Sequence, residues 1–194
     1  MFAYRVNENI TLRLPVATDA PELFALFKQN RDHLTEWQDW PNAIQTVEDC
    51  RELILRQERE YAEGKTLDCL ILFQEKMVGM CGLTKIVPFL RKAELGYWIA
   101  AEYEGKSIVT QSCKGLIAYA FTTMNLNRLA LKFKHVSEDN ENIRSRRVAE
   151  RLGFTQEGIL RQDGMTKGQM MDMVMCSLLA EEWQAMQNSS NEDV

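Results

Sequence analysis

The strongest constraint on the fold is one amphipathic segment that begins just after a glycine turn. Its apolar residues recur at helical spacing throughout; they are Val109, Cys113, Leu116, Ile117, Ala120, Phe121 and Met124. Side chains at this spacing share one face of an α-helix, and a continuous apolar face is stable in water only when other structure covers it. The sequence therefore predicts a helix over about 108–124 that packs on a sheet or on other helices.

Strand patterns on both sides of this helix indicate a mixed sheet. The segments that read as strands are 10–14, 67–73, 77–86, 93–99, 128–136, 154–160 and 171–178. A short polar turn joins the second and third, so these two are expected to pair antiparallel. Further helices are expected after Thr18 or Asp19, from Thr46 to about Gly64, and over 142–152 and 179–186. This order predicts an α/β fold with an α+β mixed sheet.

Composition excludes several other classes of protein. The net charge of −5 argues against a general nucleic-acid binder, and no apolar run approaches the roughly 20 residues of a membrane-spanning helix. Residues 1–11 lack the apolar core of a secretory signal. The five cysteines are scattered, with no CxxC or Cys/His cluster, so neither disulfides nor a metal site is expected. We expect a cytoplasmic protein with a single domain over 1–194 and a frayed end at 187–194.

The turn before the long helix is a candidate anion site. A strand over 94–99 leads into Gly105-Lys106-Ser107 and then into the helix, whose first backbone N–H groups have no intrahelical partner. The same pattern fits an ordinary helix start with a convenient glycine. A P-loop fits less well, because Ala100 stands where its first glycine belongs and the next strand ends in Lys134-His135, without an aspartate for magnesium.

Two motifs resemble those of the GCN5-related N-acetyltransferase superfamily. Glu102-x-x-Gly105-x-Ser107 is similar to the Q/R-x-x-G-x-G/A turn that binds coenzyme A (CoA), with glutamate and serine as departures; we expect Glu102 to point to solvent. Asn142-x-x-Ser145, followed by Leu-Gly-Phe at 152–154, is similar to the second signature. The resemblance covers about 8–183. It implies a central, mostly antiparallel sheet with one splayed parallel strand pair and flanking helices.

One branch of the superfamily is matched more closely. Leu-Thr-Glu-Trp-Gln-Asp-Trp-Pro at 34–41, Glu157-Gly158 and Asp172 resemble the ribosomal-protein N-terminal acetyltransferases. This implies acetyl transfer from acetyl-CoA to the α-amine of a protein N-terminus, a homodimer, and Trp37 and Trp40 as walls of the substrate entrance. Core or dimer packing explains the tryptophans equally well. Other readings are a polyamine, aminosugar or antibiotic acetyltransferase, and an acyl-CoA-binding protein without turnover.

The resemblance also implies roles for individual residues. The pantetheine arm would lie against backbone at Trp98, Ile99 and Ala100. The diphosphate would take the amides of the turn and helix start, which are Gly105, Lys106, Ser107, Ile108, Val109 and Thr110. Asn142 would orient cofactor or water, and Ser145 would protonate the leaving thiolate. Helical spacing independently places Ser145 on the inward face of its helix, where it could instead bond a backbone carbonyl or cap the helix.

The general base is open at this level. Glu157 and Asp163 are the candidate carboxylates, with a structural ion pair and a solvated loop residue as their respective alternatives; His135 is a lesser candidate. A terminal α-amine has a pKa of about 7.7–8.0, so a water chain could also suffice. Arg144, Arg147 and Arg151 recur along one helix and would face either a cofactor phosphate or solvent.

Overall fold

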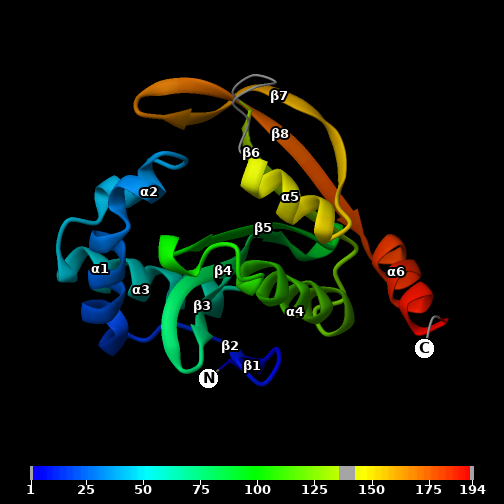
Figure 1. Cartoon of the computed structure of the whole chain (residues 1–194), viewed down its shortest axis with the longest axis horizontal. Coiled ribbons are helices and arrows are strands. Elements are labelled where there is room, and N and C mark those ends of the chain that lie inside the picture. Colours follow the sequence, from blue (N-terminus) through cyan, green and yellow to red (C-terminus); the bar gives the residue numbers. More distant parts are fainter. Residues whose placement is uncertain (1, 136–142, 193–194) are drawn as a thin grey trace.

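A computed structural model describes residues 2–135 and 143–192 of the chain (Figure 1). Within these residues eight strands form one sheet, in the order β1-β2-β3-β4-β5-β6-β8-β7. Their bounds are β1 Ala3–Arg5, β2 Ile10–Arg13, β3 Leu67–Phe73, β4 Lys76–Val87, β5 Lys92–Ile99, β6 Arg128–His135, β7 Thr155–Thr166 and β8 Gln169–Leu179. Neighbouring strands are antiparallel except for the parallel pair β5 and β6. The predicted mixed sheet is confirmed.

Helices cover both faces of this sheet. They are α1 Ala20–Gln29, α2 Arg31–Thr35, α3 Val47–Ala62, α4 Ile108–Thr122, α5 Ile143–Arg151 and α6 Ala180–Glu192, with short 3₁₀ turns η1 Ala17–Asp19, η2 Trp40–Ala43, η3 Pro88–Leu90 and η4 Ala101–Tyr103. Alternate residues of β3 face opposite sides, as strand geometry requires. Cys69 and Ile71 join the core under α4, whereas Leu70 and Leu72 join the core under α1 and α3.

The structure differs from the sequence prediction mainly at the ends of elements. The short helix α2 was not predicted, nor was β1. The β7–β8 hairpin is longer than expected, so the segment 161–168 is strand and tight turn rather than an open loop. Residues 187–192 continue α6, so the structure gives this part of the tail as helix, and the frayed end over 187–194 stays a prediction. Nothing in the tail, neither glycine nor proline, stops the helix earlier.

The parallel pair separates along its length. β5 and β6 are paired only from Lys92–Arg128 to Leu95–Leu131, although β5 continues to Ile99 and β6 to His135. β5 stays paired with β4 as far as Ile99, so within residues 2–135 and 143–192 its other edge has no strand partner beyond Leu95. The splayed parallel pair implied by the resemblance is confirmed, and it leaves backbone N–H and C=O groups available at the centre of the sheet.

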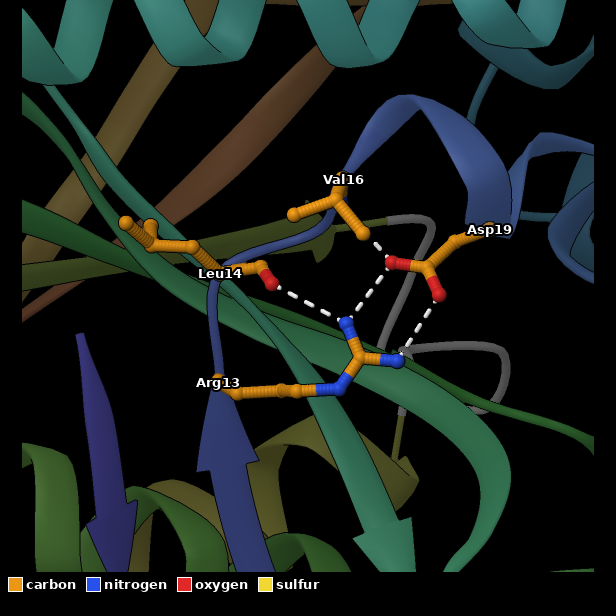
Figure 2. Close-up of polar contacts among 4 residues, drawn as sticks. All are labelled: Arg13, Leu14, Val16 and Asp19. Atoms are coloured by element: carbon orange, nitrogen blue, oxygen red, sulfur yellow. Dashed lines mark hydrogen bonds and ion pairs between the residues drawn. The ribbon is translucent and has the colours of Figure 1, made fainter. Parts of the chain in front are cut away.

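An ion pair links the end of β2 to the 3₁₀ turn η1. Arg13 donates from Nη1 and Nη2 to the two carboxylate oxygens of Asp19 at 2.7 and 2.8 Å, and Nη1 also donates to the carbonyl of Leu14 (Figure 2). The Val16 amide donates to the same carboxylate at 2.7 Å. Burial alone would raise the Asp19 pKa, but these hydrogen bonds outweigh it and lower the pKa below its ordinary value.

The variant Asp19→Asn is expected to lose about 2 kcal/mol of unfolding free energy at pH 7, because it leaves charged hydrogen bonds unmade. The lowered pKa means that this stability is present above the unfolded pKa, near 4, and is lost as the pH falls through the folded pKa. Urea unfolding at pH 7 and below pH 3 measures the difference between variant and wild type, which should shrink in acid. Glu63→Gln, in the exposed pair with Lys65, is the control and should change little. An equal loss at both pH values would contradict this account.

Candidate active site

A cavity of about 520 Å³ lies where β5 and β6 separate. Its walls come from the end of β5, the turn before α4, the first turn of α4, the inner face of α5, and α2. The lining residues are His33, Leu34, Trp37, Gln38, Tyr97, Trp98, Ile99, Tyr103, Glu104, Gly105, Ser107, Ile108, Val109, Thr110, Arg144, Ser145, Arg147, Val148 and Arg151. The two sequence motifs, about 40 residues apart, therefore meet at one cavity.

The start of α4 is built to receive an anion. Gly105 and Ser107 both have left-handed backbone, with φ of 72° and 59°, and a Cβ added at Gly105 would meet no atom within 4 Å. Gln111 donates to the Ser107 carbonyl at 3.0 Å, so the amides before it lie ahead of the first helical hydrogen bond. The first turn carries no acidic side chain. The helix dipole and these amides favour a phosphate at this position.

Two residues that carry hydroxyl groups, Ser145 and Tyr97, line the cavity from different elements. Ser145 comes from α5, and Tyr97 comes from β5, where its alternation with Leu95 and Ile99 directs it toward the same core. Burial raises the pKa of the Tyr97 hydroxyl, and the Ser145 side chain offsets part of that rise. Tyr97 is therefore a neutral donor at physiological pH. Sequence reasoning missed it, although the strand alternation contained the signal.

Comparison with known proteins agrees with this geometry. A family model described as acetyltransferase (GNAT) domain matches residues 9–155. The chain is 39% identical to the putative ribosomal N-acetyltransferase YdaF of Bacillus subtilis, over 95% of this chain and 98% of that protein. It is 27% identical to the ribosomal-protein-serine acetyltransferase of Escherichia coli, over 81% and 86% of the two chains. The chain belongs to the GNAT acetyltransferase family.

One solved structure that resembles this GNAT domain contains coenzyme A. RimL, a ribosomal L7/L12 alpha-N-protein acetyltransferase solved in complex with coenzyme A, superposes with a TM-score of 0.85 at 26% identity, covering 92% of this chain and 98% of that one. The described residues of the present chain contain no helix suited to spanning a membrane and no cluster of three or more metal-ligating side chains.

The structure divides the predicted cofactor residues of this GNAT domain into two groups. Trp98, Ile99 and most of the α4 start line the cavity, but Ala100 does not: its N–H donates to Val78 at 2.8 Å and its carbonyl accepts from Tyr103 at 2.9 Å. Lys106 also lies off the cavity lining, with its ammonium 4.9 Å from the Tyr103 ring centre. Ala100 is therefore structural, and Lys106 retains only its backbone amide as a candidate contact. Asn142 lies outside the described residues.

The carboxylate beside the turn behaves as expected. The Glu102 side chain is 65% exposed and lies 3.7 Å from Lys76, so it points away from the anion site. Its neighbour Glu104 instead lines the cavity, where it accepts hydrogen bonds from Arg144 at 2.6 and 2.9 Å and lies 3.1 Å from Nε2 of His33. The arginine stripe of α5 faces the same cavity, since Arg147 and Arg151 also line it.

Neither predicted base lines the cavity. Arg128 holds both carboxylate oxygens of Glu157 at 2.6 Å and Ser177 donates at 2.8 Å, which lowers the pKa of Glu157 to about 2. Asp163 lies on β7, where the hydrogen bond from Lys132 at 2.8 Å lowers its pKa. Both groups are thus ionised and engaged in cross-strand pairs, and we carry neither forward as the base.

The two tryptophans of the sequence motif separate. Trp37 lines the main cavity and also a second cavity of about 270 Å³, whose other lining residues are Glu36, Lys134, Thr166, Lys167, Gln169 and Met171. The β7–β8 hairpin reaches toward α2 to form this second cavity, and its Lys167 amide donates to Asp39 at 2.7 Å (Figure 1). Trp40 instead packs edge-on against Phe27, with ring centres 5.3 Å apart. Trp37 alone of the pair reaches the cavities, and Trp40 takes the packing role.

Proposed function

We propose that this GNAT enzyme transfers an acetyl group from acetyl-CoA to the α-amine of a protein N-terminus, and that this protein is ribosomal, by analogy with the named relatives. The observation that carries the proposal is the position of Trp37 between two cavities. Trp37 lines both the main cavity, which contains the start of α4, and the smaller cavity. A cofactor in the first and a chain terminus in the second would meet beside Ser145.

The residues present fit this cofactor. Diphosphate would lie on the amides at the start of α4, the arginines of α5 would face its phosphates, and the unpaired edge of β5 would offer backbone groups to the pantetheine arm. When bound, acetyl-CoA supplies an activated thioester carbonyl. The same unpaired edge carries N–H groups of the kind that stabilise an oxyanion.

The chain's own residues would then serve the proton transfers. Attack of the amine nitrogen on the carbonyl carbon would break the carbon–sulfur bond. The Ser145 hydroxyl would donate its proton to the departing sulfur and would regain a proton from water. In the main cavity, Glu104 is the carboxylate among the described lining residues, and Arg144 and His33 already engage it. We therefore assign removal of the amine proton to water, which the moderate pKa of an α-amine permits.

The proposal is tested in two stages. Acetyl-CoA at about 100 times its Kd should stabilise the protein by roughly 2.7 kcal/mol in a thermal-shift titration, and magnesium-ATP should not. Mass spectrometry then follows acetyl transfer to peptides that begin with Ser or Ala, to the same peptides with a blocked N-terminus and an internal lysine, and to spermidine and an aminosugar. We expect acetylation of the free N-termini only.

Each other result of this test has a definite meaning. Transfer to spermidine or the aminosugar in preference to peptides would overturn the protein substrate and favour the small-amine reading. Binding of acetyl-CoA without transfer to any acceptor would favour a binding protein without turnover.

We also propose a homodimer, by resemblance to the ribosomal-protein acetyltransferase branch. Light scattering tests this directly, and a monomer would contradict it.

A further inference from the structure

Glu104 joins three elements that surround the main cavity. It lies in the turn before α4, its carboxylate accepts hydrogen bonds from Arg144 of α5 at 2.6 and 2.9 Å, and one of its oxygens lies 3.1 Å from Nε2 of His33 of α2. The Glu104 and His33 side chains are 28% and 21% exposed, whereas Arg144 is 64% exposed. The contact to His33 is thus the more enclosed of the two, and the Arg144 side chain is the one with room to move.

The position of α2 depends on contacts of this kind. α2 spans only Arg31–Thr35, too short to be stable as an isolated helix. Its start is fixed by Asn30, whose Oδ1 accepts the Ala101 amide at 2.9 Å and whose Nδ2 donates to Leu26. The rest of α2 meets the cofactor turn through the His33–Glu104 contact. Trp37 follows directly, with its amide bonded to the Leu34 carbonyl at 3.2 Å.

The proposed cofactor would compete for Arg144. A diphosphate on the amides of α4 would bring negative charge beside Glu104, which carries charge of the same sign. A guanidinium binds phosphate through paired hydrogen bonds as well as it binds a carboxylate, and Arg144, with its side chain 64% exposed, can turn at little cost in buried surface. Repulsion by the phosphate would at the same time press the released carboxylate toward His33.

We propose that Glu104 is a positioning residue through which cofactor binding fixes α2 and Trp37, the side of the cavities where the acceptor would bind. Phosphate takes Arg144 from Glu104, the existing 3.1 Å contact between Glu104 and His33 is then no longer shared with Arg144 and strengthens, and α2 with Trp37 is held against the turn before α4. This inference rests on the proposed function, since it requires coenzyme A in the main cavity. It predicts that the wall of the second cavity becomes firmly placed only after the cofactor has bound.

Hydrogen–deuterium exchange of the amides at 31–37, with and without coenzyme A, measures the coupling, and calorimetry measures the affinity for coenzyme A. In the wild type, coenzyme A should slow this exchange at least fivefold. Glu104→Ala should bind coenzyme A at least threefold more tightly, because a competing carboxylate is gone, yet should show no such slowing. Glu102→Ala removes the exposed carboxylate two positions earlier and should behave as the wild type.

Arg144→Gln gives the opposite signature and does not depend on the folding of the Glu104 variant. Without Arg144, the Glu104 carboxylate no longer shares its charge between Arg144 and His33, so exchange at 31–37 should be slow even without coenzyme A, whose affinity should fall at least fivefold. Slowing by coenzyme A that survives in Glu104→Ala, or wild-type exchange in unliganded Arg144→Gln, would overturn the coupling. Wild-type protein that binds coenzyme A without slower exchange would overturn the coupling alone, whereas absence of binding would overturn the proposed function as well.

Discussion

Replacing Ser145 by alanine is expected to lower kcat by roughly 100- to 1000-fold and to leave the affinity for coenzyme A within about twofold, the size of effect that a positioned proton donor supplies. Ser145 lines the cavity from α5 and its side chain interacts with that of Tyr97 on β5, whereas the phosphates would lie on the start of α4. Its removal therefore affects the departing sulfur rather than cofactor binding. Thiol release under saturating acetyl-CoA measures kcat, and calorimetry measures the affinity.

Ser177→Ala is the matched control for this prediction. Ser177 is buried on β8, and its hydroxyl donates to Glu157 outside the cavity. Its loss should therefore leave kcat unchanged. If Ser145→Ala keeps the wild-type rate and only lowers the melting temperature, Ser145 is a structural hydroxyl. Tyr97→Phe combined with Ser145→Ala should lower the rate by less than the product of the single effects, since adjacent donors act as a unit.

Local patterns in the sequence predicted most of the fold. The spacing of apolar residues over 109–124 predicted α4 because a helix with one continuous apolar face has only one way to pack, and every residue of that set up to Phe121 is buried. The turn at Gly105–Ser107 was likewise visible, because left-handed backbone and an open helix start require small residues over a short stretch. These features depend on neighbours in the chain.

The missed features depend on partners far away in the chain. Glu157 and Asp163 on β7 looked available as bases. Their partners Arg128 and Lys132 stand 29 and 31 positions earlier in the sequence, on β6, which is separated from β7 by β8. Glu104 was overlooked for the same reason, since Arg144 is 40 positions away. No local pattern encodes such pairs, which arise only when the strand order brings the elements together.

The hairpin of β7 and β8 shows how tertiary pairing overrides local composition. Its sequence over 161–168 is polar and contains two glycines, which is typical of a loop. Pairing with β8 nevertheless extends to Thr166–Gln169, through irregular register near Gly164. The apolar β8 strand supplies the partner that this weak strand former lacks by itself. The extension matters because it carries Thr166 and Lys167 to the second cavity.

Introducing a carboxylate at the start of α4 is expected to lower the affinity for coenzyme A and to raise the unfolding free energy of the unliganded protein. Ser107→Glu should weaken coenzyme A binding at least 100-fold relative to Ser107→Gln, because a negative charge about 5 Å from phosphate costs about 3 kcal/mol at an effective dielectric constant near 20. Both variants place a long side chain on the same left-handed residue, so backbone strain cancels between them.

The same pair of variants should differ in the opposite direction without ligand. A carboxylate at the N-terminus of α4 interacts favourably with the helix dipole, so unliganded Ser107→Glu should be more stable than Ser107→Gln by about 0.3–1 kcal/mol. Urea unfolding measures this gain, and calorimetry measures the loss of affinity. A glutamate that stabilises the free protein while repelling coenzyme A must lie at the N-terminus of α4, where the helix dipole would also attract the diphosphate. Equal affinity of the two variants would instead remove this turn from the cofactor site.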